Sequence, residues 1–151
     1  MWSAILIVTV AAVDQVAKAL VQNTVPGGAS FPMLGGAFYI THVQNPGSAF
    51  NVFATGTVPI VVTAILIASW AVLACSRRRL PLGTVFQTGT ALVLGGAIGN
   101  LIDRVRVGYV IDFIDLRFWP VFNLADAAIT VGALVLVYGA VQRKPGRRSS
   151  R

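Results

Sequence analysis

The sequence predicts an all-α membrane protein with four transmembrane helices, a small extracytoplasmic β-sheet and a short interfacial segment. Of its 151 residues, 56% are hydrophobic and only 11% are charged, whereas about a quarter of the residues in a soluble domain are charged. Four apolar stretches, at about 3–21, 58–75, 83–102 and 124–141, each approach the length that crosses the core of a bilayer. We therefore expect residues 1–151 to form a single polytopic membrane domain.

The first span, at about 3–21, contains two charged residues. An isolated charge inside a membrane is costly, so Asp14 is expected to face the other helices and to pair with Lys18, four residues later. The same apolar run could also begin as a cleavable signal peptide. However, residues 1–3 carry no basic side chain and no clean cleavage site follows, so we interpret the span as a retained helix.

The two segments that face outward are predicted to be structured. Within a β region at about 30–55, residues 37–43 alternate loosely, a turn follows at 45–47, and 48–53 could return as a second strand. Residues 112–121 interleave aromatic and charged side chains, which is typical of a segment at the membrane interface.

The basic residues set the predicted orientation. The net charge is +7, and eight of the 12 Lys and Arg residues lie either between the second and third spans or in the tail at 143–151. Basic residues accumulate on the cytoplasmic side of membrane proteins, so both termini are expected in the cytoplasm. The tail, whose composition is typical of disorder, then indicates orientation and not a nucleic-acid partner.

Catalytic carboxylates must come from five aspartates, because the sequence contains no glutamate. They are Asp14, Asp103, Asp112, Asp115 and Asp126. Four of the five are expected at one membrane face, beside the connection between the third and fourth spans. Two carboxylates held close in a partly dry site cannot both ionise, so one can activate water while the other donates a proton. The pattern is thus compatible with aspartic protease chemistry.

Each of these carboxylates also has a structural interpretation. Asp126 lies in the first turn of the fourth span, where the helix dipole stabilises a negative charge, but it can equally complete a capping box with Asn123. Asp112 lies among apolar residues, which raise the pKa of a carboxyl, or it is a surface acid at the headgroup level. We interpret Asp103 as a structural residue that closes the third helix, and Asp115 as a solvated residue.

The single histidine and the single cysteine are interpreted structurally. His42 is expected in a strand, and Cys75 as a packed thiol near the inner face. Together they cannot form an internal disulfide or a typical zinc site, so no metal or cofactor is expected. His42 and Ser48 lie on either side of a turn, but no nucleophile elbow accompanies them, which makes serine chemistry a weak alternative.

Five short motifs lie in order along most of the chain. In one-letter code they are DQVAK at 14–18, NPGSAF at 45–50, GGAIGNLIDR at 95–104, GYVIDF at 108–113 and FNLAD at 122–126. Together they closely resemble the signatures of bacterial lipoprotein signal peptidases (signal peptidase II). The resemblance implies an intramembrane aspartyl endopeptidase that removes the signal peptide of prolipoproteins, cleaving just before a cysteine that carries diacylglyceryl. It also implies a bacterial cytoplasmic membrane, an active site near the outer face, and membrane lipid and inhibitory peptide antibiotics as partners.

The resemblance also implies roles for individual residues. The catalytic pair corresponds to Asp112 and Asp126, and from its place at a helix start we predict Asp126 to be the ionised member. Positions that line the pocket of the family correspond to Asn45, Asn100, Arg104 and Asn123, and supporting positions to Asp14, Lys18 and Asp103. Ser48 stands where the family commonly has alanine, a departure that leaves the pair untouched.

Two other classes of function are compatible with parts of the sequence. A small proton or ion transporter could use Asp14 and Lys18 with the outward acids, but the second span has few polar side chains to continue such a path. A non-enzymatic membrane scaffold would tolerate replacement of Asp112 or Asp126 by asparagine.

Overall fold

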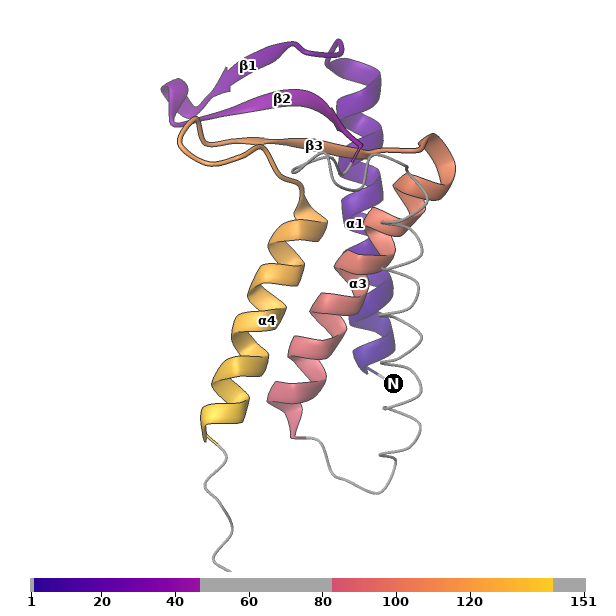
Figure 1. Cartoon of the computed structure of the whole chain (residues 1–151), viewed down its shortest axis with the longest axis vertical. Helices are drawn as coiled ribbons and strands as arrows, with labels where there is room; N and C mark the ends of the chain where they lie inside the picture. The colour runs from indigo at the N-terminus through magenta and orange to yellow at the C-terminus, as the bar shows by residue number, and fades with distance from the viewer. Residues whose placement is uncertain (1, 47–82, 143–151) are drawn as a thin grey trace, which may run out of the picture.

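The computed structural model describes residues 2–46 and 83–142. Its elements are α1 (Trp2–Thr24), β1 (Ser30–Met33), the 3-10 helix η1 (Leu34–Gly36), β2 (Phe38–Asn45), α3 (Thr84–Val107), β3 (Val110–Asp115) and α4 (Leu124–Gln142). The three long helices run side by side, and the sheet lies across one end of them (Figure 1). α3 packs against both α1 and α4. The return strand expected at 48–53, the span expected at 58–75, Cys75 and the tail at 143–151 lie outside the described residues.

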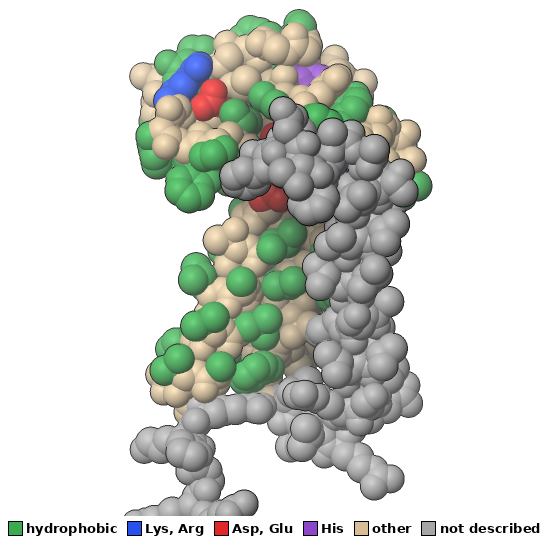
Figure 2. All heavy atoms as spheres, viewed as in Figure 1, with side chains coloured by type: hydrophobic (Ala, Val, Ile, Leu, Met, Phe, Trp, Pro, Cys, Tyr) green, Lys and Arg blue, Asp and Glu red, His purple; other side chains and the backbone are tan. Residues whose placement is uncertain are grey.

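α1, α3 and α4 are each long and apolar enough to cross a membrane, as predicted for three of the four spans. Hydrophobic side chains cover the helices on the face shown in Figure 2, whereas the visible charged side chains lie at the sheet and just beneath it. Large apolar side chains such as Ile5, Val8 and Leu134 are exposed on these helices. Such surfaces are suited to contact with lipid, and they indicate a multi-pass membrane protein.

The predicted end of the third span at residue 102 is wrong. α3 continues to Val107 and therefore includes Asp103 and Arg104. It ends where Gly108 adopts the left-handed φ of 85° and donates its N–H to the carbonyl oxygen of Arg104 at 3.1 Å. Glycine adopts this conformation without a steric penalty, so Gly108 can end the helix five residues after the predicted boundary.

β2 is the central strand of an antiparallel sheet of order β1-β2-β3, which confirms a strand over most of 37–43 and the place of His42 in it. The strand continues to Asn45, so the turn predicted at 45–47 does not begin there. The segment at 112–121, which is predicted to lie at the membrane interface, begins as a strand, because its residues up to Asp115 belong to β3. β3 pairs with β2 from Asp115 opposite Tyr39 to Val110 opposite Asn45. Its first four residues are all buried, so the sequence lacks the alternation of a half-exposed strand.

The chain folds back immediately after β3. Phe122 pairs with Ile114, whose N–H lies 2.7 Å from the Phe122 carbonyl oxygen. Beneath the sheet, Val21 and Val25 pack with Phe113 in a buried apolar cluster. The fold-back therefore starts α4 beside the middle of β3, which brings the surroundings of Asp112 and Asp126 together.

Candidate active site

Polar side chains gather where the sheet meets the helix ends. Those that are buried here are Asp14, Lys18, Asn100, Asp103, Asp112 and Asn123. They come from α1, α3, β3 and the residue before α4, which are far apart in the sequence. Buried polar groups require hydrogen-bond partners, and these residues supply them to one another.

Asp112 lies in β3 with 2% of its surface exposed. Asn123 Nδ2 donates to its Oδ1 at 2.6 Å, and Asn45 Nδ2 donates to its Oδ2 at 2.9 Å. Burial raises the pKa of Asp112 to about 6; the negative charge of Asp126 acts in the same direction, while the hydrogen bonds from Asn45 and Asn123 oppose it. Asp112 therefore holds its proton at a pH where an ordinary aspartate has lost it.

Asp126 is half-buried in the first turn of α4. Its Oδ1 accepts a hydrogen bond from Asn100 Nδ2 at 2.7 Å, and its Oδ2 lies 3.4 Å from the backbone N–H of Asn123. In return, the N–H of Asp126 donates to Asn123 Oδ1 at 2.9 Å. The predicted capping box is thus confirmed, and forming it leaves the Asp126 carboxylate free to accept from Asn100 as well.

Asn123 connects the two carboxylates. Its Nδ2 contacts Asp112, and it also donates to Asn100 Oδ1 at 3.1 Å. Its Oδ1 accepts from the backbone of Asp126. A side-chain amide has one acceptor end and one donor end, so the start of α4 fixes which end of Asn123 faces Asp112.

Lys18 lies fully buried between two aspartates. Its Nζ is 2.8 Å from Asp14 Oδ2 and 2.7 Å from Asp103 Oδ2, and it donates to Asn100 Oδ1 at 2.9 Å. The predicted pairing of Asp14 with Lys18 is therefore confirmed. Asp14 Oδ1 also accepts the N–H of Ala125, and Asp103 Oδ2 that of Ile111. The cluster thereby joins α1 and α3 to the start of α4 and to β3.

Gln15 belongs to this cluster, although sequence reasoning assigned it no role. Its Nε2 donates to Asp103 Oδ1 at 2.8 Å and to the carbonyl oxygen of Gly99 at 3.1 Å. The available signal was helical spacing, because residues 14, 15 and 18 lie close together on one side of a helix.

Arg104, half-buried, donates to the backbone oxygen of Asn100 at 3.3 Å and interacts electrostatically with Asp126 and Asp112.

Asp115 is not solvated as predicted, because only 6% of its surface is exposed. It accepts hydrogen bonds from Thr41 at 3.0 Å and from the N–H of Arg117 at 2.8 Å. The Arg117 N–H is the main cause that lowers the pKa of Asp115. The described hydrogen bonds of Asp115 are made with Thr41 and Arg117 and do not join the network around Asp112 and Asp126.

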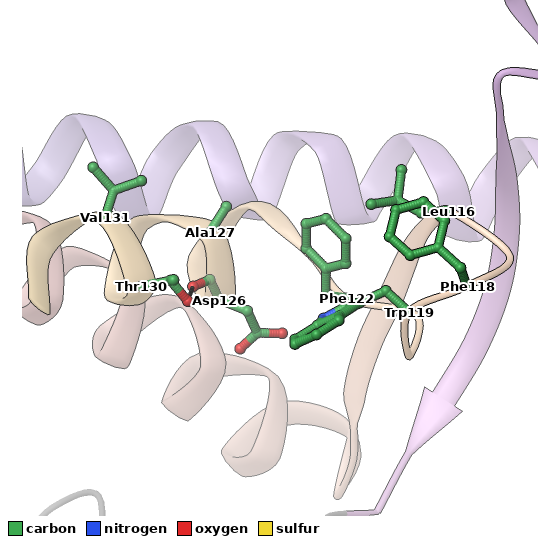
Figure 3. A pocket seen from close by; sticks show the side chains of 8 residues that line it. All are labelled: Leu116, Phe118, Trp119, Phe122, Asp126, Ala127, Thr130 and Val131. Atoms are coloured by element: carbon green, nitrogen blue, oxygen red, sulfur yellow. Dashed lines mark hydrogen bonds between the residues drawn. The ribbon is translucent and has the colours of Figure 1, made fainter. Parts of the chain in front are cut away.

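An apolar groove opens beside Asp126. It has a volume of about 360 Å³ and is lined by Leu116, Phe118, Trp119, Phe122, Asp126, Ala127, Thr130 and Val131. In Figure 3 the Asp126 carboxylate points toward the indole of Trp119. The ring of Phe122 lies between Ala127 of α4 and Leu116, which follows β3. A carboxylate that accepts from Asn100 on one side thus lines an apolar groove on the other.

Comparison with known proteins assigns the family. A family model described as signal peptidase (SPase) II matches residues 6–142. A lipoprotein signal peptidase of Moorella thermoacetica is 44% identical over 89% of each chain, and one of Halothermothrix orenii is 38% identical over 94% of this chain and 97% of its own. A bacterial membrane enzyme solved by the in meso method at 2.3 Å superposes with a TM-score of 0.84 at 28% identity, covering 99% of this chain and 93% of the other. The chain therefore belongs to the signal peptidase II family of membrane peptidases.

Proposed function

We propose that Asp112 and Asp126 form the catalytic pair of an aspartic endopeptidase that removes the signal peptide of prolipoproteins. The observation that carries this proposal is the asparagine network. It holds the two carboxylates in different environments, with Asp112 buried and Asp126 at a helix start and beside a groove. Paired carboxylates in unlike environments divide naturally into an acid and a base.

Asp126 is the proposed base and Asp112 the proposed acid. The raised pKa of Asp112, about 6, favours its protonated form. The amide hydrogens of Asn100 and the first turn of α4 favour a negative charge on Asp126. Because the two groups interact, the protons belong to the pair as a unit.

In the first step, Asp126 takes a proton from water while the water oxygen bonds to the scissile carbonyl carbon. Asp112 donates its proton to the carbonyl oxygen, which gives a gem-diol. In the second step, Asp126 passes its proton to the amide nitrogen, the C–N bond breaks, and Asp112 takes a hydroxyl proton from the gem-diol. The products are a carboxylic acid and a new amino terminus, and both aspartates return to their starting states.

The groove beside Asp126 is the proposed site for apolar parts of the substrate next to the scissile bond. Its aromatic and aliphatic lining suits an acyl chain or apolar side chains of a signal peptide. A diacylglyceryl group on the substrate cysteine would keep that bond at the membrane surface. Peptide antibiotics that inhibit the family would compete for the same surface.

The proposed location is the bacterial cytoplasmic membrane, with both termini in the cytoplasm and the sheet outside. The sheet end of the bundle, which holds the site, is the end opposite the described end of α4 that precedes the basic tail (Figure 1). Basic segments favour the cytoplasmic side. A proton-transport function is less well supported, because the described buried charges lie at the sheet end and not along the bundle.

The proposal is tested by cleavage of a lipidated prolipoprotein, with the released signal peptide measured by mass spectrometry. Asp112→Asn and Asp126→Asn are each expected to lower kcat by about 10³-fold or more, because each removes a proton-transfer group. Asp115→Asn is the matched control, since it changes the same residue type in the same strand as Asp112 but outside the network. Retained turnover in either of the first two variants would contradict the proposal.

A further inference from the structure

Lys18 lies between the buried ion pairs and the asparagines that hold the proposed catalytic pair. Its ammonium group has three hydrogens and three close acceptors: Asp14 Oδ2, Asp103 Oδ2 and Asn100 Oδ1, at 2.8, 2.7 and 2.9 Å. An ammonium group can only donate hydrogen bonds. The atom of Asn100 that faces Lys18 must therefore be its oxygen.

The orientation of the Asn100 amide decides whether its nitrogen or its oxygen faces the Asp126 carboxylate. With its oxygen held by Lys18, Asn100 directs Nδ2 at Asp126 Oδ1, at 2.7 Å. The reversed amide would place an oxygen against the carboxylate, and neither atom could donate. Asn123 Nδ2, whose orientation is fixed by the N–H of Asp126, donates to the same oxygen at 3.1 Å. Lys18 is therefore the charged one of two donors that hold the Asn100 oxygen.

We propose that Lys18 is a positioning residue: by holding the Asn100 oxygen, its ammonium group directs the Asn100 amide hydrogens at Asp126 and favours the ionised carboxylate that activates water. This inference rests on the proposed function, because it assigns Asp126 the role of base. The other charged groups that interact with the pair are Arg104 from α3 and, within the pair, Asp112 from β3. Neither Arg104 nor Asp112 contacts Asn100 Oδ1 among the described hydrogen bonds, which come from Lys18 and Asn123, and Lys18 is the donor that carries a charge.

The experiment replaces Lys18 without changing the charge of the buried cluster. Lys18→Met alone would leave two carboxylates uncompensated in the interior, which is strongly destabilising. The combined variant Asp14→Asn with Lys18→Met removes one negative and one positive charge together, and the amide oxygen of the introduced asparagine can still accept the N–H of Ala125. Asp14→Asn alone is the matched control, since it breaks the same ion pair but keeps Lys18 on Asn100.

The readout is the acid limb of the pH dependence of kcat/KM in the full-length enzyme. In the combined variant this limb is expected to move to higher pH by about one unit, because the ionised pair loses one charge-stabilising hydrogen bond. In Asp14→Asn alone it is expected to stay at or below the wild-type position. A lower unfolding temperature with an unmoved acid limb in the combined variant would show that Lys18 is merely structural and would overturn the inference.

A double-mutant cycle tests whether Lys18 acts through Asn100. In an Asn100→Ala background, the combined substitution is expected to move the acid limb no further. A further move of the same size would show that Lys18 acts through its charge alone. Failure of the proposed function would look different, because wild type would not cleave or Asp126→Asn would retain turnover.

The contact of Asn100 with Asp126, on which the inference rests, can also be tested in wild-type enzyme, without any variant. The side-chain amide resonances of Asn100, followed by NMR in micelles with labelled asparagine, are expected to titrate with the midpoint of the acid limb. An Asn100 amide that is insensitive to this titration would overturn the proposal, even if every variant failed to fold.

Discussion

At the scale of single residues, the site depends on amide side chains that cannot change their charge. Asn45 and Asn123 both donate to Asp112, while Asn100 donates to Asp126. An amide adds a directed dipole without adding a titrating group. The pKa of Asp112 is thus raised mainly by burial and lowered by hydrogen bonds from Asn45 and Asn123, while the charges of Asp126 and Lys18 act on it in opposite directions.

The pH dependence of catalysis is predicted from the raised pKa of Asp112. The profile of kcat/KM is expected to be bell-shaped, and activity should fall as pH rises through about 6, because Asp112 then loses the proton that it must donate. The hydrogen bond from Asn45 lowers this pKa. Asn45→Ala should therefore move the descending limb to higher pH, by up to about one unit.

Gln44→Ala is the control for this measurement, because Gln44 is the preceding residue of β2, is exposed, and carries the same amide group. A descending limb that stays in place in Asn45→Ala, or moves equally in both variants, would contradict the assignment of that limb to Asp112.

At the scale of elements, the site depends on how closely the helices approach. A Cβ on Gly96 would collide with the carbonyl oxygen of Ala125 in α4, and a Cβ on Gly99 would lie 2.6 Å from Asp14 Oδ2. α3 can therefore bring Asn100 against both α1 and α4. Small residues commonly allow such contacts between transmembrane helices.

Gly96→Ala is expected to lower the stability of the fold by about 1–3 kcal/mol, because the backbone of α4 must move away. Inside a helix, alanine otherwise stabilises relative to glycine by roughly 0.5–1 kcal/mol. Thermal unfolding in detergent micelles measures the difference. Gly83→Ala, just before α3, is the control, since its Cβ would meet no atom of the described residues within 4 Å. Equal unfolding temperatures for the two variants would refute the steric argument.

The loop between β3 and α4 is expected to contribute to substrate binding. Trp119→Ala removes a large part of the groove lining next to Asp126, so KM for the lipidated substrate should rise about tenfold, with kcat changed much less. Phe31→Ala is the control, because Phe31 is an exposed aromatic residue of β1 that is not part of the groove lining. A loss confined to kcat would place Trp119 in the chemical step instead.

The elements differ in how well the sequence predicts them. The length of the apolar stretches predicted the three described helices, and helix-capping rules predicted the capping box formed by Asn123 and Asp126. β3 was missed, because a strand buried on both faces has no alternation, and the pairing of Phe122 with Ile114 depends on tertiary contacts. The contacts of Gln15 and the burial of Asp115 likewise follow from how the elements meet, which periodicity does not encode.

At the scale of the whole molecule, the sheet closes one end of a helical bundle (Figure 1). The buried cluster of Asp14, Lys18 and Asp103 joins both layers, through backbone N–H groups of Ala125 and Ile111. The proposed catalytic pair thus lies where the sheet meets the helices, with Asp112 in the sheet and Asp126 in α4.

The proposed orientation is tested with single cysteines in a Cys75→Ser background. Leu34→Cys, at an exposed position of η1, should react with a membrane-impermeant maleimide in intact cells. Gln142→Cys, at the end of α4, should react only after permeabilisation. The opposite pattern would reverse the orientation and place the sheet in the cytoplasm.

The length of α4 bears on which substrates can place their scissile bond at the site. Its 19 residues extend about 28 Å at the α-helical rise, close to the thickness of the hydrocarbon layer, roughly 30 Å. Since Asp126 lies in the first turn, an α4 that spans this layer in the proposed orientation would hold the carboxylates near the outer edge of the hydrocarbon. A substrate whose apolar segment is one helical turn longer would present its bond about 5 Å away from them. Selection by depth would let one enzyme process many signal peptides that share little sequence.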